Sequence, residues 1–190
     1  GMAYTSLDQL DSAEYYYKKA LSSGQKHSQS ALDLDHIYQQ LAYICILQGK
    51  YLDAIDVHTK VLNTTDLENQ FYASLAIGRI FKTLGLYAEA KANFKQADSI
   101  AQKTNIRQIH LNNYAAQLKV SKNLAEAEQL IQKGLALRDS FESNHTILTL
   151  FLSAGALYLD SLKLDRATDF YQRALALSIK IKSIGSKNDA

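Results

Sequence analysis

Apolar residues recur along this chain at the spacing of amphipathic helices, and one fourteen-residue version of the pattern returns five times. The copies are DQLDSAEYYYKKAL (8–21), GKYLDAIDVHTKVL (49–62), GLYAEAKANFKQAD (85–98), KNLAEAEQLIQKGL (122–135) and LKLDRATDFYQRAL (162–175). Each has alanine at its sixth position, and successive alanines are separated by 41, 36, 37 and 40 residues: Ala13, Ala54, Ala90, Ala127 and Ala167. A repeat of this length with helical content predicts a stack of helical hairpins rather than one closed globular core.

A second apolar pattern with helical period precedes each copy from the second onward. It is carried by HIYQQLAYICIL, FYASLAIGRIF, HLNNYAAQLKV and LFLSAGALYL. Each of these segments predicts the first helix of a hairpin whose second helix is the fourteen-residue phrase. Gly49 and Gly85 stand where glycine commonly ends a helix. The matching turns at 122–123 and 162–163 have no glycine.

Small residues on the predicted first helices indicate close approach of the two helices in a hairpin. We expect Ala42, Gly78, Ala115 and Gly155 to face the alanine of the second helix. The residue four places after that alanine is bulky in every copy, and we expect it to pack against the next hairpin: Tyr17, His58, Phe94, Ile131 and Tyr171. His58 therefore occupies a packing position, which favours a structural role over a ligand role.

Composition and charge exclude several classes of function. The 190 residues include no proline, which permits long helices, and 21 basic residues against 19 acidic ones give a net charge of +2. Such a balance gives no reason to expect nucleic-acid binding by this segment, which needs a concentrated basic surface. The one cysteine, Cys45, lies in an apolar run and is predicted to be buried. No apolar run approaches the roughly 18 residues of a membrane-spanning helix, so we expect no membrane insertion by this segment.

Catalytic and metal-binding patterns are missing from the sequence. No two histidines have the spacing of a helical metal site, and there is no glycine-rich phosphate loop or Gly-x-Ser-x-Gly motif. The carboxylate pairs Asp33/Asp35 and Glu126/Glu128 are two residues apart, which places their members on different helix faces, and we expect them to be solvated. The sequence therefore predicts no enzymatic activity, no cofactor and no metal site.

These spacings resemble the tetratricopeptide repeat (TPR) family. The best matching unit has Gly78, Gly85, Tyr87, Ala90, Phe94 and Ala97, and a second has Gly155, Leu164, Ala167, Tyr171 and Ala174. The resemblance implies an all-α fold, a right-handed α-α superhelix (TPR solenoid) of antiparallel helix hairpins. The period exceeds the family's usual length of about 34 residues. The continuation ALSIKIKSIGSKNDA resembles a longer-period variant that is common in bacterial regulators and motor-protein cargo adaptors.

The repeats predict one array over residues 1–190. We expect a partial repeat followed by four full ones, with the boundaries 2–28, 30–64, 67–104, 106–141 and 145–184. Both ends look cut, so we expect a fragment of a longer chain. At the last helix, Ala174, Leu177, Ile181 and Ile184 have no following helix to cover them. The alternative to a further repeat is a homodimer contact through this helix.

The resemblance implies that a partner lies as a peptide or a helix in the concave groove that the first helices line. Mapped onto this chain, the partner-binding residues are Gln39, Tyr43, Tyr72, Arg79, Lys82, Asn112, Asn113 and Lys119. The three cations would suit a carboxylate or an acidic peptide. The alternative is that these residues are ordinary solvated side chains.

Three functions follow from these observations. The first is a non-catalytic protein–protein interaction scaffold. The second is the sensory segment of a larger bacterial signalling or transcriptional regulator, and the third is a structural spacer that homo-oligomerises through its C-terminal helix. The composition suits either the cytoplasm or the periplasm.

Overall fold

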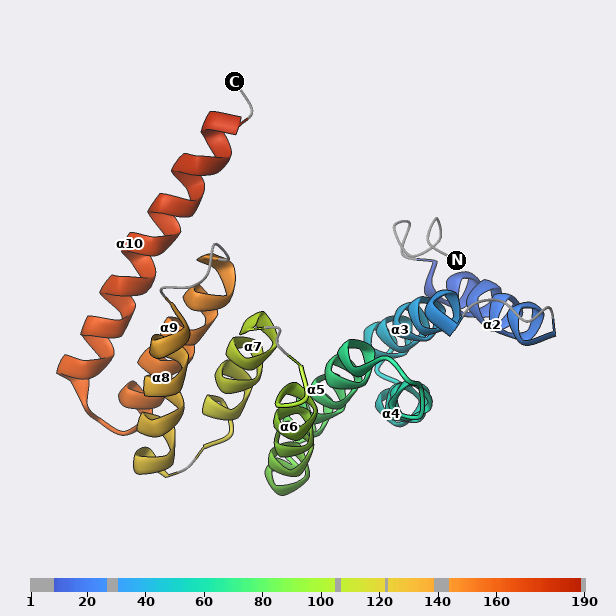
Figure 1. Ribbon diagram of the computed structural model, residues 1–190, viewed down its shortest axis with the longest axis horizontal. Coiled ribbons are helices and arrows are strands. Elements are labelled where there is room, and N and C mark those ends of the chain that lie inside the picture. Colours follow the sequence, from blue (N-terminus) through green and yellow to red (C-terminus); the bar gives the residue numbers. More distant parts are fainter. Residues whose placement is uncertain (1–8, 27–30, 105–106, 122, 139–143, 189–190) are drawn as a thin grey trace. The chain divides into compact units, whose positions relative to one another are not determined.

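The computed structural model describes residues 9–26, 31–104, 107–121, 123–138 and 144–188. Within these ranges, the side chains of 25–26, 31–33, 107–112, 138, 144 and 183–188 are not described. Every regular element of the described residues is an α-helix (Figure 1). The helices are α2 (Leu10–Lys26), α3 (Ala31–Leu47), α4 (Tyr51–Leu62), α5 (Leu67–Thr83), α6 (Tyr87–Ala101), α7 (Arg107–Leu118), α8 (Leu124–Arg138), α9 (Asn144–Asp160) and α10 (Leu164–Asn188). The predicted all-α fold is confirmed.

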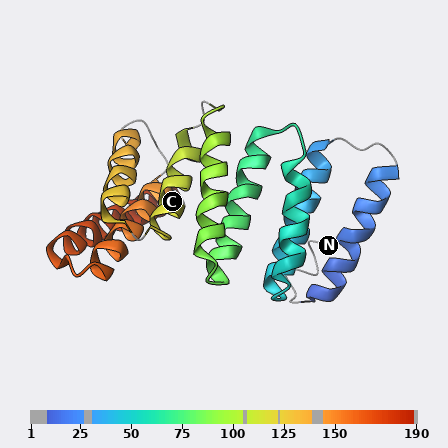
Figure 2. The same ribbon diagram turned by 90° about the horizontal axis from the view of Figure 1, so that it is seen from below.

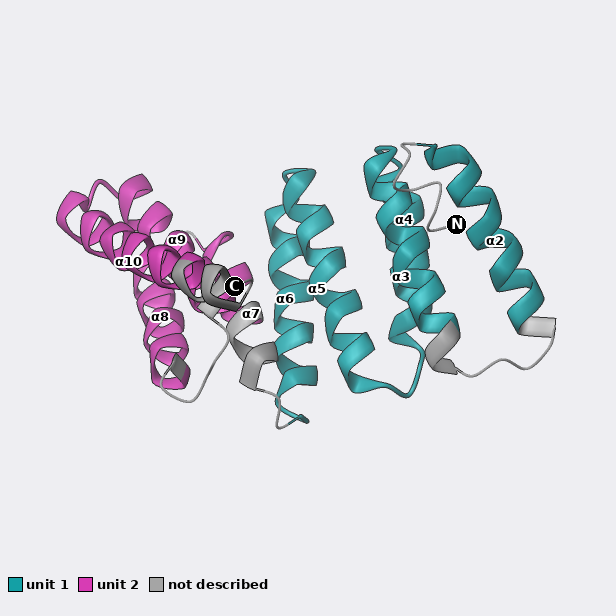
Figure 3. Ribbon diagram, turned by 90° about the horizontal axis from the view of Figure 1, so that it is seen from above, with its two compact units in different colours: residues 1–104 teal, residues 105–190 magenta. Residues whose placement is uncertain are grey.

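The chain divides into two compact units, residues 1–104 and 105–190 (Figure 3). Unit 1 contains α2 to α6, and unit 2 contains α7 to α10. The border falls between two of the predicted repeats, 67–104 and 106–141. One continuous array with the repeat boundaries given above stays a prediction.

Helix pairs joined by short turns build both units. In unit 1, the two helices of the α5–α6 hairpin lie side by side (Figure 2). Gly49 and Gly85 have φ angles of +73° and +77°, in the left-handed region. At the first of these turns, the Gly49 N–H donates to the Ile46 carbonyl at 3.0 Å, and the Lys50 N–H donates to the Cys45 carbonyl at 2.8 Å. This pair of bonds is a Schellman motif, so the expected helix-ending role of both glycines is confirmed.

The α9–α10 turn has the same hydrogen bonds without a glycine. The Leu162 N–H donates to the Leu159 carbonyl and the Lys163 N–H to the Tyr158 carbonyl, both at 2.9 Å. Leu162 takes the left-handed position with φ +57° and is 84% exposed. An L-residue other than glycine is strained there, since its Cβ approaches the following carbonyl oxygen.

Leu162→Gly is therefore expected to stabilise the protein by about 1 kcal/mol, because glycine adopts this conformation without the Cβ penalty. Urea unfolding followed by circular dichroism measures the change. The matched control is Leu175→Gly, which makes the same substitution at an exposed position inside α10. It should destabilise by about 1 kcal/mol through lost helix propensity. If both variants are destabilised, the left-handed position is not a source of strain.

The core of each hairpin is built around the small residues of its first helix. Gly78 faces the ring of Phe94, since a Cβ on Gly78 would lie 2.5 Å from Phe94 Cε1. Gly155 faces Tyr171 in the same way, at 2.8 Å. Both glycines thus face the second helix of their hairpin, where the nearest atoms belong to the bulky residue four places after the alanine. Their expected contact with the alanine itself stays a prediction.

The exposed apolar residues of α10 differ from those that the sequence predicts. Ala174 is only 2% exposed and packs in the unit 2 core, Leu177 and Ile181 are half-buried, and Ile184 lies outside the described side chains. Leu175 and Ile179 are exposed instead, at 62% and 61%. The register of the exposed apolar row is thus set by how α10 packs on α9. Self-association through this helix stays a prediction.

Candidate protein-interaction surface

The first helices of the two complete hairpins in unit 1, α3 and α5, carry five of the predicted partner-binding residues. The chain reverses twice between α3 and α5 through short turns, so the two helices run in the same direction. The Gln39 side-chain amide donates to Asn69 Oδ1 at 2.9 Å, which joins α3 to α5 directly. Tyr43 follows Gln39 by one helical turn, and Tyr72 follows Asn69 by nearly one turn. The contact between the two helices is thus at Gln39 and Asn69, and the exposed side chains follow it along each helix.

A polar network fixes the N-terminal part of this pair of helices. Asn69 donates through Nδ2 to Asp35 Oδ2 at 2.9 Å, while its own backbone N–H donates to the capping Asp66 at the same distance. Asp35 is only 2% exposed, so the expectation that it is solvated is wrong. Gln39 is half-buried and serves to link the helices. The role of Asn69 could not be predicted from the sequence, because one asparagine in a helix carries no pattern that marks its partner.

Beyond this network, α3 and α5 present apolar and cationic side chains to solvent. We call Tyr43, Leu47, Tyr72, Arg79 and Lys82 the first-helix surface. Tyr43 is 51% exposed, Leu47 47% and Tyr72 36%. Arg79 is exposed two helical turns after Tyr72, and Lys82 is half-buried.

The charge on the first-helix surface is uncompensated. Among the residues that the structure describes, neither Arg79 nor Lys82 forms an ion pair with a carboxylate. Desolvation lowers the pKa of the Arg79 guanidinium, but arginine stays charged because its ordinary pKa is far above neutral pH. Burial, helped by the nearby Glu68, raises the pKa of Tyr72, so its hydroxyl remains a hydrogen-bond donor. The surface can therefore offer apolar contact and a positive charge together.

The three predicted partner-binding residues in unit 2 have different environments. Lys119 is exposed. Asn113 is 0% exposed, so it is not part of an open surface, and the expectation for this residue is wrong. Its side chain faces inward because helix packing, rather than residue type, determines which side of α7 is buried. Asn112 lies outside the described side chains.

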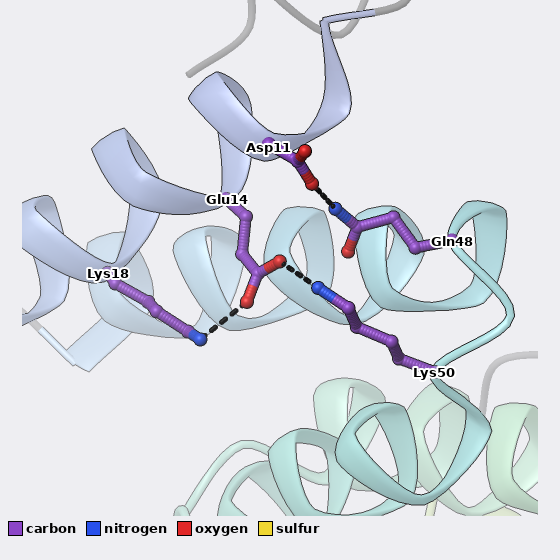
Figure 4. A network of polar contacts seen from close by, with 5 residues as sticks. All are labelled: Asp11, Glu14, Lys18, Gln48 and Lys50. Atoms are coloured by element: carbon purple, nitrogen blue, oxygen red, sulfur yellow. Dashed lines mark hydrogen bonds and ion pairs between the residues drawn. The ribbon is translucent and has the colours of Figure 1, made fainter.

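A second polar network, on α2 and the α3–α4 turn, is structural (Figure 4). Glu14 accepts from Lys18 at 2.5 Å and from Lys50 at 2.7 Å, and Gln48 donates to Asp11 at 2.8 Å. Glu14 is 8% exposed, yet it lies beneath the ends of two lysines rather than in the apolar core. The bonds from Lys18 and then Lys50 outweigh desolvation and lower the pKa of Glu14 from 4.5 to about 2. These contacts attach α2 to the following hairpin.

Two residues with reactive side chains are buried, as the sequence predicts. Cys45 is 2% exposed, and burial raises the pKa of its thiol, which keeps the thiol protonated and inert. His58 is 7% exposed, and burial lowers the pKa of its imidazole to about 4. Both side chains therefore act as neutral core residues near neutral pH.

The described residues contain no group of three or more histidine, cysteine, aspartate or glutamate side chains arranged to hold a metal ion. In the same part of the chain, no helix has the length and apolar character needed to cross a membrane.

Comparison with known proteins identifies the repeat. BtubC (BKLC) from P. vanneervenii has a similar solved structure, with a TM-score of 0.78, 19% identity, and coverage of 94% of this chain and 77% of that chain. The nearly identical TPR-like repeats of a Podosopora anserina protein described as a kinesin light chain give a TM-score of 0.71 at 16% identity, covering 95% and 92% of the two chains. The family model named Tetratricopeptide repeat matches residues 1–26 and 72–104. The chain therefore contains tetratricopeptide repeats, and its fold is that of TPR proteins. No curated protein sequence matches it.

The TPR assignment agrees with the geometry of the hairpins. Gly78 and Phe94 lie in a matched segment, and they form the tight contact between α5 and α6. TPR arrays are generally non-catalytic scaffolds that bind protein partners. The likeness to the two solved structures extends to the fold alone.

Proposed function

We propose that this protein is a non-catalytic scaffold whose first-helix surface binds a peptide or a helix of a protein partner. The observation that carries the proposal is the combination of exposed Tyr43, Leu47 and Tyr72 with an unpaired Arg79 on two adjacent first helices. Tyrosine and arginine are the residue types enriched among those that dominate binding energy at protein interfaces.

The chemistry of the surface indicates a partner with an apolar side chain next to an acidic one. Tyr43, Leu47 and Tyr72 can bury an aliphatic or aromatic side chain, which supplies most of the favourable free energy. Arg79 can bind a carboxylate with two parallel hydrogen bonds, and Lys82 adds positive charge beside it. The Gln39–Asn69 bond holds the two helices at a fixed spacing, which lowers the conformational cost of binding.

The experiment is selection of a random peptide library on the immobilised chain, followed by affinity measurement for the peptides recovered. We expect peptides that combine apolar residues with aspartate or glutamate, and binding about tenfold weaker to Arg79→Glu than to the wild type. Tyr72→Ala should weaken the same peptides through lost apolar contact. The matched control is Lys95→Glu, which makes the same change of charge at an exposed position on α6.

Two outcomes would count against this surface. One is that the recovered peptides bind Arg79→Glu and Tyr72→Ala as tightly as they bind the wild type. The other is that Lys95→Glu weakens binding as much as Arg79→Glu, which would indicate attraction to net charge rather than to a site.

A further inference from the structure

Unit 2 contains a pocket that the proposed function does not use. It lies between the second helices α8 and α10, above α9, and has a volume of about 620 Å³. Its walls include Glu128, Gln129 and Lys133 from α8, Tyr158 from α9, and Arg166 and Phe170 from α10. The volume falls in the range of small-ligand sites, roughly 300–1,000 Å³. We call it the α8–α10 pocket.

The floor of the α8–α10 pocket is a pair of ordered aromatic rings. Tyr158 and Phe170 are 2% and 4% exposed, and their rings stack with centroids 5.6 Å apart and planes 10° from parallel. The Tyr158 hydroxyl donates to Glu128 Oε1 at 3.3 Å. Burial, reinforced by Glu128, raises the pKa of Tyr158, so the phenol keeps the proton that it donates. The floor is therefore apolar. The stacking contact with Phe170 and the hydrogen bond to Glu128 fix the position of the Tyr158 ring.

The rim of the pocket is positively charged. The Arg166 guanidinium lies over the Tyr158 ring, 6.0 Å from its centre, in a cation–π contact. Arg166 and Lys133 are both exposed, and neither has an ion-pair partner in the described part of the chain. Glu128 is the one carboxylate that lines the pocket, so the lining carries a net charge of +1. A negative ligand would gain more from this rim than a neutral or cationic one.

A pocket at the equivalent position of unit 1 has different lining residues, so the residues of the α8–α10 pocket are not common to the repeats. A pocket of about 500 Å³ lies between α2 and α4, above α3. Counted from Ala54 and Ala167, Cys45 stands in place of Tyr158, Val57 in place of Phe170 and Asp53 in place of Arg166. The hairpin packing thus makes a hollow at both places, but at these three positions the α8–α10 pocket has two aromatic rings and an arginine where the unit 1 pocket has a cysteine, a valine and an aspartate.

We propose that the α8–α10 pocket binds the carboxy-terminal residue of a partner peptide, with an apolar side chain on the Tyr158–Phe170 floor and the terminal carboxylate on Arg166. Arginine is the side chain best suited to a carboxylate, because its guanidinium donates two parallel hydrogen bonds. The Gln129 and Gln132 amides, both exposed in the pocket wall, can donate to and accept from the peptide backbone. This site is independent of the first-helix surface, which belongs to unit 1.

The test is NMR titration of the ¹⁵N-labelled full chain with N-acetyl-L-phenylalanine as the probe. We expect shift changes centred on the amides of Gln129, Gln132, Arg166 and Phe170, and millimolar affinity for so small a probe. N-acetyl-L-phenylalaninamide, which lacks the carboxylate, should bind at least about fivefold more weakly. Arg166→Gln should weaken the acid by a similar factor and leave the amide unchanged. Glu128→Gln should tighten the acid about twofold, since it removes the opposing charge.

The matched control is Lys60→Gln, which removes one positive charge from the equivalent pocket of unit 1 and should not change the affinity. Equal binding of the acid and the amide would overturn the proposal, as would shift changes outside the pocket or an unaltered affinity of Arg166→Gln. Tighter binding of phenyl phosphate than of N-acetyl-L-phenylalanine would also overturn it, because the site would then prefer a phosphate. These outcomes leave the first-helix surface untested, so the two proposals can fail separately.

Discussion

Gly78→Ala is expected to destabilise the protein by about 1–3 kcal/mol, although alanine is the better helix former. The added Cβ would lie 2.5 Å from Cε1 and 2.6 Å from Cδ1 of Phe94, closer than non-bonded carbons approach. Phe94 is 0% exposed, so its ring has no open space to move into. The variant must therefore separate α5 from α6 or shift the ring. Urea unfolding followed by circular dichroism measures the loss.

A glycine of unit 2 and a compensating substitution test this explanation. At Gly134, an added Cβ would meet the end of the Leu150 side chain, at 2.5 Å from Cδ2. Leu150 is also buried, at 1% exposed, but its methyl tip changes rotamer in less space than the Phe94 ring needs, so Gly134→Ala should cost less than Gly78→Ala. Combining Gly78→Ala with Phe94→Leu should cost less than the sum of the two single changes, because the smaller side chain frees the space. Strict additivity would show that the ring contact is not the cause.

The free energy of unfolding is expected to fall by about 3 kcal/mol between pH 6.5 and pH 4 because of His58. Burial lowers the pKa of this imidazole from 6.5 to about 4 in the folded chain. Between these two values the unfolded state binds a proton that the native state does not, so stability decreases as the pH decreases. The stabilising effect of the neutral histidine is complete above pH 6.5 and is lost as the pH falls through the folded pKa.

Urea unfolding at a series of pH values measures this dependence, and His58→Leu should remove most of it. His145→Leu, at an exposed position, is the matched control and should keep it. Glu14 acts in a lower window, because its pKa is lowered from 4.5 to about 2 by Lys18 and Lys50. Its contribution is present above pH 4.5 and disappears toward pH 2, so it does not account for a change near pH 5. A His58→Leu variant with the same pH dependence as the wild type would contradict the assignment.

The two binding proposals place different chemistry in different units. The first-helix surface combines Tyr43, Tyr72 and Arg79 on helices of unit 1, whereas the α8–α10 pocket combines a buried aromatic floor with Arg166 in unit 2.

The helices, the hairpins and their turns could be predicted from the amino-acid sequence alone. These features depend on local interactions: apolar spacing decides whether a segment is an amphipathic helix, and a glycine at a helix end adopts the left-handed conformation easily. The repeated segment 49–62 accordingly contains the helix α4, Tyr51–Leu62, and Gly49 lies in the turn before it. Burial of Cys45 and His58 could be predicted for the same reason, since each stands at a core position of its helix.

The contacts between residues of different helices could not be predicted in this way. The tertiary structure brings Asp35 to Asn69 across two helices, turns Asn113 inward, and places Phe94 over Gly78. It also assembles the α8–α10 pocket from three separate helices. These outcomes depend on the rotation and approach of one helix against another, which many side chains set together. Helical periodicity fixes which residues share a face, but it does not fix which neighbour that face contacts.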